Sequence, residues 1–154
     1  MVGLFVPRGS TLPRNTHVVE VMMSQWRPLA YLWALPTSLL GLLFVPESLV
    51  SGEVRWIDGV LEVHGRLVRF FLTHCTLLRG GASAMTLGHV VLGRDRKLLE
   101  ETRRHERVHV RQCERWGPLF IPAYLVACVV AFLSGGRAYE DNPFEREAFG
   151  EAAG

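Results

Sequence analysis

Cysteine is scarce in this chain, and its spacing matches no metal or disulfide pattern. The three cysteines, Cys75, Cys113 and Cys128, lie far apart and form no C-x-x-C pair, so neither a zinc ribbon nor a disulfide framework is supported. An excess of charge of one sign is also lacking, because the chain has 17 Lys+Arg and 15 Asp+Glu, a formal net charge of +2. This balance excludes a strongly basic nucleic-acid-binding protein and an acidic disordered tail.

Lysine is nearly absent, since Lys97 is the only lysine among the 17 basic residues, a bias typical of a GC-rich bacterial genome. Apolar residues are abundant instead. They make up 49% of the chain, against 21% charged residues, and the mean hydropathy is +0.18. A positive mean hydropathy is unusual for a soluble domain and indicates a membrane segment. The length of 154 residues predicts one domain, or a small domain with an appendage.

The N-terminal part of the chain predicts a tail followed by a membrane anchor. Residues 1–25 show little hydrophobic periodicity, and their prolines and glycines favour a flexible tail. From Pro28 to Pro46 there are 19 consecutive uncharged residues, just enough to span a bilayer of about 30 Å at about 1.5 Å per residue. We therefore predict an anchor helix over residues 26–47, with lipid contacts through residues 28–46. A cleaved signal peptide is the alternative.

Residues 48–154 are predicted to form one domain that begins with strands. Residues 53–65 place β-branched and aromatic side chains on both sides of Asp58-Gly59, a dipeptide that favours a tight hairpin turn. Further strands are predicted over residues 66–74 and 82–93. The result is a small sheet of three or four strands, mostly antiparallel.

The C-terminal half is predicted to be helical, so the fold class is α+β. A charged helix over residues 94–116 is closed by Gly117-Pro118, a helix stop signal. Residues 116–136 carry no charge and form a second membrane-type stretch. A last helix is predicted to begin at Pro143, with Asn142 as its N-cap.

The charged helix contains the motif H-E-x-x-H, from His105 to His109. On a helix these two histidines lie one turn apart on the same face, so both imidazoles can hold one metal ion. Glu106 lies close to the open coordination position, where it can act as general base toward a metal-bound water. Composition alone predicts roughly 0.02 such motifs per chain, so coincidence is a weak explanation.

A catalytic zinc site needs a third protein ligand and keeps its fourth position for water. Glu145, at the start of the last predicted helix, is the favoured candidate. The other candidates are Glu147, His74, His89 and Cys113. Gln112, Tyr124 and Tyr139 are further candidates for contacts with substrate, bound water or the oxyanion.

The identity of the third ligand depends on whether the second apolar stretch crosses a membrane. If residues 118–133 crossed a bilayer, Glu145 and His109 would lie on opposite sides of it, and an upstream residue would have to be the ligand. If Glu145 is the ligand, residues 118–133 form a buried or re-entrant helix. Pro118, Pro122 and Tyr124 interrupt the apolar run and favour a core helix.

These motifs together resemble the gluzincin clan of zinc peptidases, over about residues 82–149. In its thermolysin-like and membrane-bound members an E-x-x-A motif follows H-E-x-x-H and supplies the third ligand, and Glu145 to Ala148 match that pattern. Phe149 stands where the clan frequently has Asp. The strand before the charged helix resembles the edge strand along which zincins lay an extended substrate. The resemblance implies a zincin-like fold, a minimal catalytic domain and one Zn²⁺ per chain.

The sequence therefore predicts a membrane-anchored zinc hydrolase of the bacterial inner membrane, a metallopeptidase acting on peptides or proteins and not on nucleic acid. In this hypothesis His105, His109 and Glu145 hold Zn²⁺, and Glu106 is the general base. Two alternatives remain at this point. One is a membrane protein that binds zinc without hydrolytic activity, and the other is a membrane scaffold protein in which the motif is coincidental.

Overall fold

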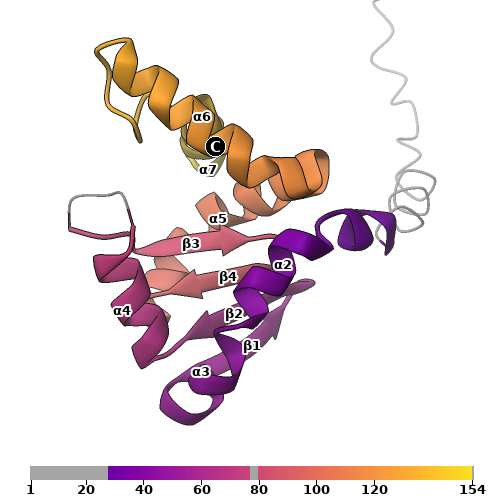
Figure 1. The fold of residues 1–154 in the computed structure, drawn as a ribbon. Helices are drawn as coiled ribbons and strands as arrows, with labels where there is room; N and C mark the ends of the chain where they lie inside the picture. Colours follow the sequence, from indigo (N-terminus) through magenta and orange to yellow (C-terminus); the bar gives the residue numbers. More distant parts are fainter. Residues whose placement is uncertain (1–27, 77–79, 154) are drawn as a thin grey trace, which may run out of the picture.

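A computed structural model describes residues 28–76 and 80–153, so the tail predicted at residues 1–25 lies outside the described residues. The described chain has an α+β fold in which helices pack around one four-stranded sheet (Figure 1). After a helical segment at residues 28–33, the elements are α2 (Leu35–Leu42), α3 (Val45–Ser51), β1 (Glu53–Ile57), β2 (Val60–His64), α4 (Arg66–His74), β3 (Ala84–Leu87), β4 (Val90–Gly93), α5 (Arg96–Trp116), a 3-10 turn (Gly117–Leu119), α6 (Phe120–Leu133) and α7 (Pro143–Ala152).

The sheet has the strand order β1-β2-β4-β3, so β1 and β3 are its edges. β1 pairs antiparallel with β2, and β3 with β4, whereas β2 and β4 are parallel. The predicted hairpin is confirmed: Ile57 pairs with Val60, and the turn residues Asp58 and Gly59 both have positive φ, 48° and 82°. This left-handed turn matches the twist of the two strands.

Two of the predicted strands are wrong. Residues 66–74 form the helix α4, because the buried side chains Val68 and Leu72 are four residues apart and therefore lie on one helix face. Residues 82–93 form two strands, β3 and β4, rather than one. The chain reverses at Gly88, whose φ is 63°.

The single anchor helix predicted over residues 26–47 is also wrong for the part that is described. The helix is interrupted at Ala34 and again at residues 43–44, which leaves the short helices α2 and α3. α2 packs on the sheet: Ser38 Oγ accepts a hydrogen bond of 2.9 Å from the backbone N–H of His89. A Cβ at Gly41 would lie 2.6 Å from Val90 Cβ. Part of this apolar run therefore covers the sheet.

The second apolar stretch is helical, as expected, but it is not a buried core helix. Within α6 only Phe120 and Ala131 are buried. In the described residues, the helical stretch Arg96–Leu133 is the one that is long and apolar enough to cross a membrane, and it is not N-terminal. Burial therefore does not explain the apolar composition of α6.

Two hydrophobic clusters fix α4 and α5 on opposite faces of the sheet. Val90 and Leu92 of β4 pack with α4, while Val91, on the other face, packs with Leu99 and Val110 of α5. This alternation follows the two-residue period of a strand. Because α5 lies across one face and touches β3, the histidine-bearing helix runs beside an edge strand.

Candidate metal centre

Two capped helices bring the predicted ligands together. α5 begins at Asp95, whose side chain accepts a hydrogen bond from the Leu98 N–H, and ends at Gly117. α7 begins at Asn142, whose side chain accepts from the Phe144 N–H, with a proline in the first turn. The start of α7 follows the sequence prediction, whereas α5 begins two residues later than predicted. α7 packs against α5, which places Glu145 beside the two histidines.

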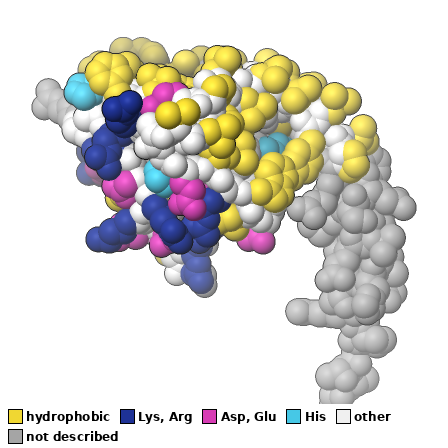
Figure 2. Space-filling view, turned by 90° about the horizontal axis from the view of Figure 1, so that it is seen from below, with side chains coloured by type: hydrophobic (Ala, Val, Ile, Leu, Met, Phe, Trp, Pro, Cys, Tyr) yellow, Lys and Arg dark blue, Asp and Glu magenta, His cyan; other side chains and the backbone are white. Residues whose placement is uncertain are grey.

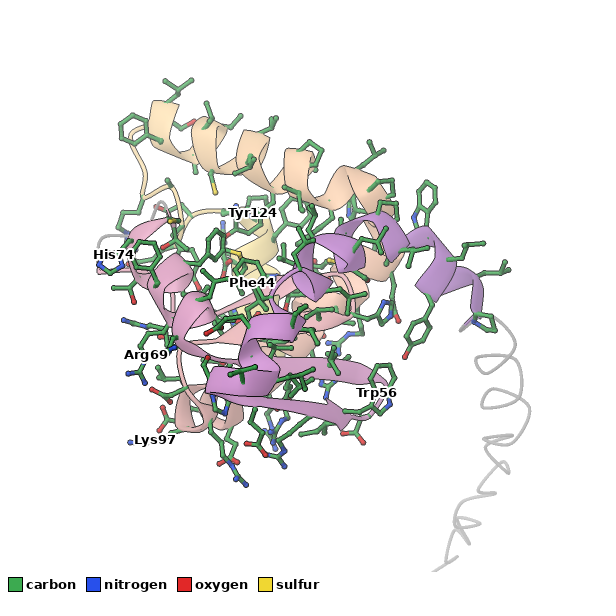
Figure 3. The ribbon with its side chains drawn as sticks, turned by 60° about the horizontal axis from the view of Figure 1, so that its bottom comes forward. Phe44, Trp56, Arg69, His74, Lys97 and Tyr124 are labelled. Atoms are coloured by element: carbon green, nitrogen blue, oxygen red, sulfur yellow. The ribbon has the colours of Figure 1, made fainter. Side chains whose placement is uncertain are left out.

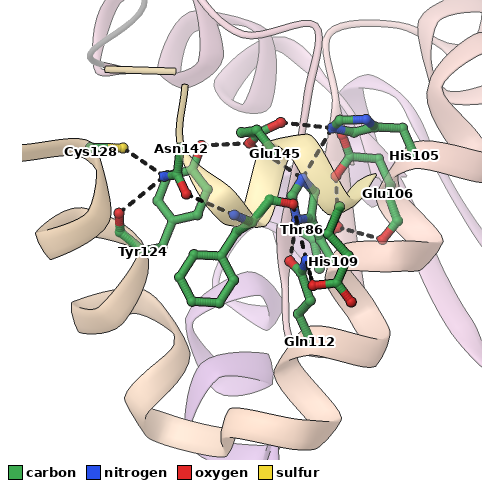
Figure 4. Close-up of polar contacts among 11 residues, drawn as sticks. Thr86, His105, Glu106, His109, Gln112, Tyr124, Cys128, Asn142 and Glu145 are labelled. Carbon is green, nitrogen blue, oxygen red and sulfur yellow. Dashed lines mark hydrogen bonds and ion pairs between the residues drawn. The ribbon is translucent and has the colours of Figure 1, made fainter. Parts of the chain in front are cut away.

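The three predicted ligands converge on one point (Figure 4). The Nε2 atoms of His105 and His109 are 3.0 Å apart. Glu145 Oε2 lies 3.1 Å from His105 Nε2, and Glu145 Oε1 lies 3.4 Å from His109 Nε2. Tetrahedral zinc with bonds of about 2.0–2.1 Å separates its ligand atoms by about 3.3 Å. The spacing therefore fits a single metal ion held by all three residues.

The surroundings of Glu145 also fit a bound cation. The residue is 2% exposed, and its buried Oε2 atom makes no hydrogen bond of acceptable geometry within the described residues. Burial raises the pKa of Glu145, but the two imidazoles and the Tyr124 hydroxyl outweigh it and lower the pKa to about 2. The carboxylate is therefore ionised, and a buried negative charge requires a positive partner. A donor set of two imidazoles and one carboxylate suits Zn²⁺ better than Mg²⁺ or Ca²⁺.

Gln112 holds His109 in the orientation that a metal ligand would need. The Gln112 amide nitrogen donates to the Phe144 carbonyl and to Glu147 Oε2, both at 3.0 Å. Its oxygen therefore faces His109 Nδ1, at 2.8 Å. An amide oxygen can only accept, so His109 carries its proton on Nδ1 and its Nε2 lone pair is free for a metal. Gln112 thus lies on the Nδ1 side of His109, away from the point on which the three residues converge.

Glu106 lies beside the cluster but is not one of the converging ligands. The side chain is 5% exposed, and its Oε2 atom accepts a hydrogen bond of 2.7 Å from Thr86 Oγ1. Burial raises the pKa of Glu106 more than the neighbouring His109 lowers it. Thr86 belongs to the edge strand β3, so the carboxylate is held next to the open edge of the sheet.

Two tyrosines and one phenylalanine surround the cluster. Tyr124 of α6 donates a hydrogen bond of 2.6 Å to Glu145 Oε1, so it holds this carboxylate in place. Phe149 lies against His105, with ring centroids 4.7 Å apart, and Tyr139 packs against Phe149 with its ring perpendicular to it. Burial and the charge of Glu145 raise the pKa of Tyr139, which keeps its hydroxyl protonated.

The remaining candidate ligands lie outside the cluster. Cys113 is fully buried in a hydrophobic cluster, and burial raises the pKa of its thiol to about 12. His89 is 3.0 Å from Glu114. His74 is on α4, where its Nδ1 contacts a carbonyl of the same helix. Glu147 accepts a hydrogen bond from Gln112, and of the candidates Glu145 is the one that lies with the two histidines in the described residues.

Sequence reasoning missed two contacts that hold α5 in place. One is the hydrogen bond from Thr86. The other joins Arg103 to the buried Glu62 of β2, through two hydrogen bonds of 2.7 and 2.9 Å. An acidic residue inside the apolar strand VLEVH is the signal that could have indicated a buried partner.

No protein-family model, curated protein or solved structure matches this chain. The converging His105, His109 and Glu145, with Glu106 beside them, are therefore the features from which a function is inferred.

Proposed function

We propose that this protein is a zinc-dependent metallopeptidase of the gluzincin type, associated with the bacterial inner membrane. The observation that supports it best is the convergence of His105, His109 and Glu145, with a buried carboxylate next to them. Three protein ligands leave one coordination position for water, the arrangement of catalytic zinc sites.

The residues of the site suit hydrolysis with an activated water. A zinc ion at the cluster would supply Lewis-acid polarisation and lower the pKa of a bound water. Glu106 then has the role of general base: Thr86 holds its Oε2, and we assign proton transfer to its Oε1. The proton taken from water passes on to the leaving amine. Phe149 borders His105, Tyr139 packs on Phe149, and we assign both to the substrate side of the cluster.

The position of β3 supports a peptide as the substrate. β3 is an edge of the sheet, and an extended peptide can add to such an edge through backbone hydrogen bonds. Thr86 connects this strand to Glu106. A peptide lying along β3 would therefore pass the general base, as the resemblance to zincins implies.

Metal analysis and a peptidase assay test this proposal. We expect purified protein to contain close to one zinc per chain and to cleave a library of quenched fluorescent peptides. A chelator should abolish cleavage, and added Zn²⁺ should restore it. Protein that takes up no zinc after repletion would show that the site is not a metal centre. Zinc-loaded protein that cleaves no peptide would contradict the peptidase assignment.

Gln112→Leu should lower the affinity for zinc. It removes the acceptor that keeps the His109 proton on Nδ1, and groups in this position contribute about 10–100-fold to metal affinity. Competition with a chromophoric chelator measures the change. The matched control is Glu147→Ala, which removes one partner of Gln112 but leaves the Phe144 carbonyl to orient the amide. A larger loss in the control than in Gln112→Leu would contradict the role of Gln112.

A further inference from the structure

Most of α6 is apolar and exposed. Its exposed large side chains are Leu125, Val126, Val129, Val130, Phe132 and Leu133, each at least 44% exposed. Single exposed apolar residues are normal on a protein, whereas an entire exposed helix side marks an interaction surface. Figure 3 shows Tyr124 on the inner side of α6, toward the rest of the protein, so the exposed residues belong to its outer side.

A second group of exposed apolar residues continues this surface from the N-terminal helices. It comprises Leu29, Leu32, Trp33, Leu35, Leu39, Leu40, Leu42 and Leu43. The two groups meet where the ring of Trp33 lies over Gly117, and Ala34 packs beside Phe120 below them. We call both groups together the apolar face. Figure 2 shows hydrophobic side chains gathered along one side of the molecule and charged ones gathered on another.

The sequence around α6 indicates what covers this face. Residues 116–136 contain no charged side chain, and the nearest flanking charges are the basic Arg115 and Arg137, both exposed. Trp33 and Trp116 are half-exposed at the junction of the two groups. Tryptophans and arginines at the border of an apolar surface are typical of contact with lipid headgroups. A partner that binds in water would not require a run this long without charge.

The packing of α7 determines how α6 lies. α6 has 14 residues, about 21 Å, which is short of the ~30 Å hydrocarbon core. The Asn142 side chain donates to the Tyr124 carbonyl and to Cys128 Sγ, so α7 returns along α6. If α6 entered the bilayer end on, Arg137, Glu140 and Asp141 would be carried into it, at a high energetic cost.

We propose that the apolar face docks on a lipid bilayer, with α6 lying in the plane of one leaflet and not crossing it. Both ends of α6 then lie at headgroup level on the same side, as in interfacial helices. The metal cluster lies directly beneath this surface, because Tyr124 joins α6 to Glu145. The proposal does not depend on the cluster being catalytic.

Flotation with vesicles tests the docking surface. We expect the full-length protein to float with vesicles of phosphatidylcholine and phosphatidylglycerol. The pair Val126→Glu and Val130→Glu changes residues that are 62% and 56% exposed, and it should weaken binding more than about tenfold. The matched control is Leu67→Glu with Phe70→Glu on α4, which is not part of the apolar face (Figure 1) and where exposure is 44% and 57%. The control should bind like the wild type.

Cysteine labelling distinguishes an α6 that docks on the bilayer from an α6 that crosses it. This experiment leaves the residues of the apolar face unchanged. Lys97→Cys and Gly150→Cys, in a background without the native cysteines, lie before and after α6. In proteoliposomes an impermeant maleimide should reach both positions from the same side. Labelling from opposite sides would show that α6 crosses. Protein that does not float would also overturn the proposal. So would a dimer in solution that the Val126→Glu and Val130→Glu changes break apart, because the apolar face would then bind a second copy of the chain.

Discussion

Glu106→Gln is expected to retain zinc and to lose peptide hydrolysis. The carboxylate is not among the converging ligand atoms, so the metal content should stay close to one per chain. An amide cannot accept the proton from water, and general-base catalysis contributes roughly 10²–10⁴-fold. Its oxygen can still accept from Thr86, so the packing of the buried side chain is preserved. Zinc content and kcat, measured on the same preparation, test the retention of the metal and the loss of hydrolysis together.

Glu101→Gln is the matched control for this experiment. It makes the same chemical change on the same helix, at an exposed position whose carboxylate pairs only with Lys97 in the described residues. Activity and metal content should both remain at the wild-type level. If Glu106→Gln lost the zinc, or kept full activity, the separation of ligand from general base would be wrong.

The helices of the site could be predicted from sequence because local signals determine them. Asp95 and Asn142 cap α5 and α7 with their own side chains, and Gly117 ends α5 with a positive φ. The four-residue spacing of His105 and His109 then places both imidazoles on one face. Each of these features depends on residues within a few positions of one another, and the structure confirms the helices.

The errors in the sheet arose where composition and spacing indicate different elements. The residues of α4 include valine, phenylalanine and threonine, which favour strands. Their burial follows a helical period, with Val68 and Leu72 facing the sheet, and packing outweighs propensity. The reversal at Gly88 is held by a hydrogen bond from the His89 N–H to Ser38 of α2, which is far away in sequence. Such a contact cannot be read from the local pattern.

Residue spacing alone left several candidates for the third residue of the predicted metal site. The residue that reaches the two histidines depends on how α7 packs against α5. The resemblance indicated Glu145, and the structure brings it to the histidines. The links that hold it there are long-range: Gln112 reaches the Phe144 carbonyl, and Tyr124 reaches Glu145 itself. The exposure of α6 was missed because local signals were relied on too far. Prolines and a tyrosine favoured a core helix, but they do not reveal which side of the helix is covered.

Zinc is expected to stabilise the folded protein, and ligand variants should lose this effect. The ligands come from two helices, His105 and His109 from α5 and Glu145 from α7, so the ion binds only when α7 is docked. Binding to the folded state alone adds about 4 kcal/mol of unfolding free energy when free zinc is about a thousand times Kd. The rise in Tm on adding zinc should therefore be several degrees in the wild-type protein.

His109→Ala and Glu145→Ala should each abolish that rise in Tm, because loss of one ligand of three costs several kcal/mol of metal binding. The comparison is made between zinc-loaded and zinc-free samples of the same variant, so any effect on the zinc-free fold cancels. His74→Ala is the control, since His74 lies on α4, outside the cluster, and it should respond to zinc like the wild type. A Glu145→Ala variant that keeps the full rise would remove Glu145 from the ligand set. The link between α7 and α5 would then have to come from packing and hydrogen bonds alone, with Gln112 as its centre.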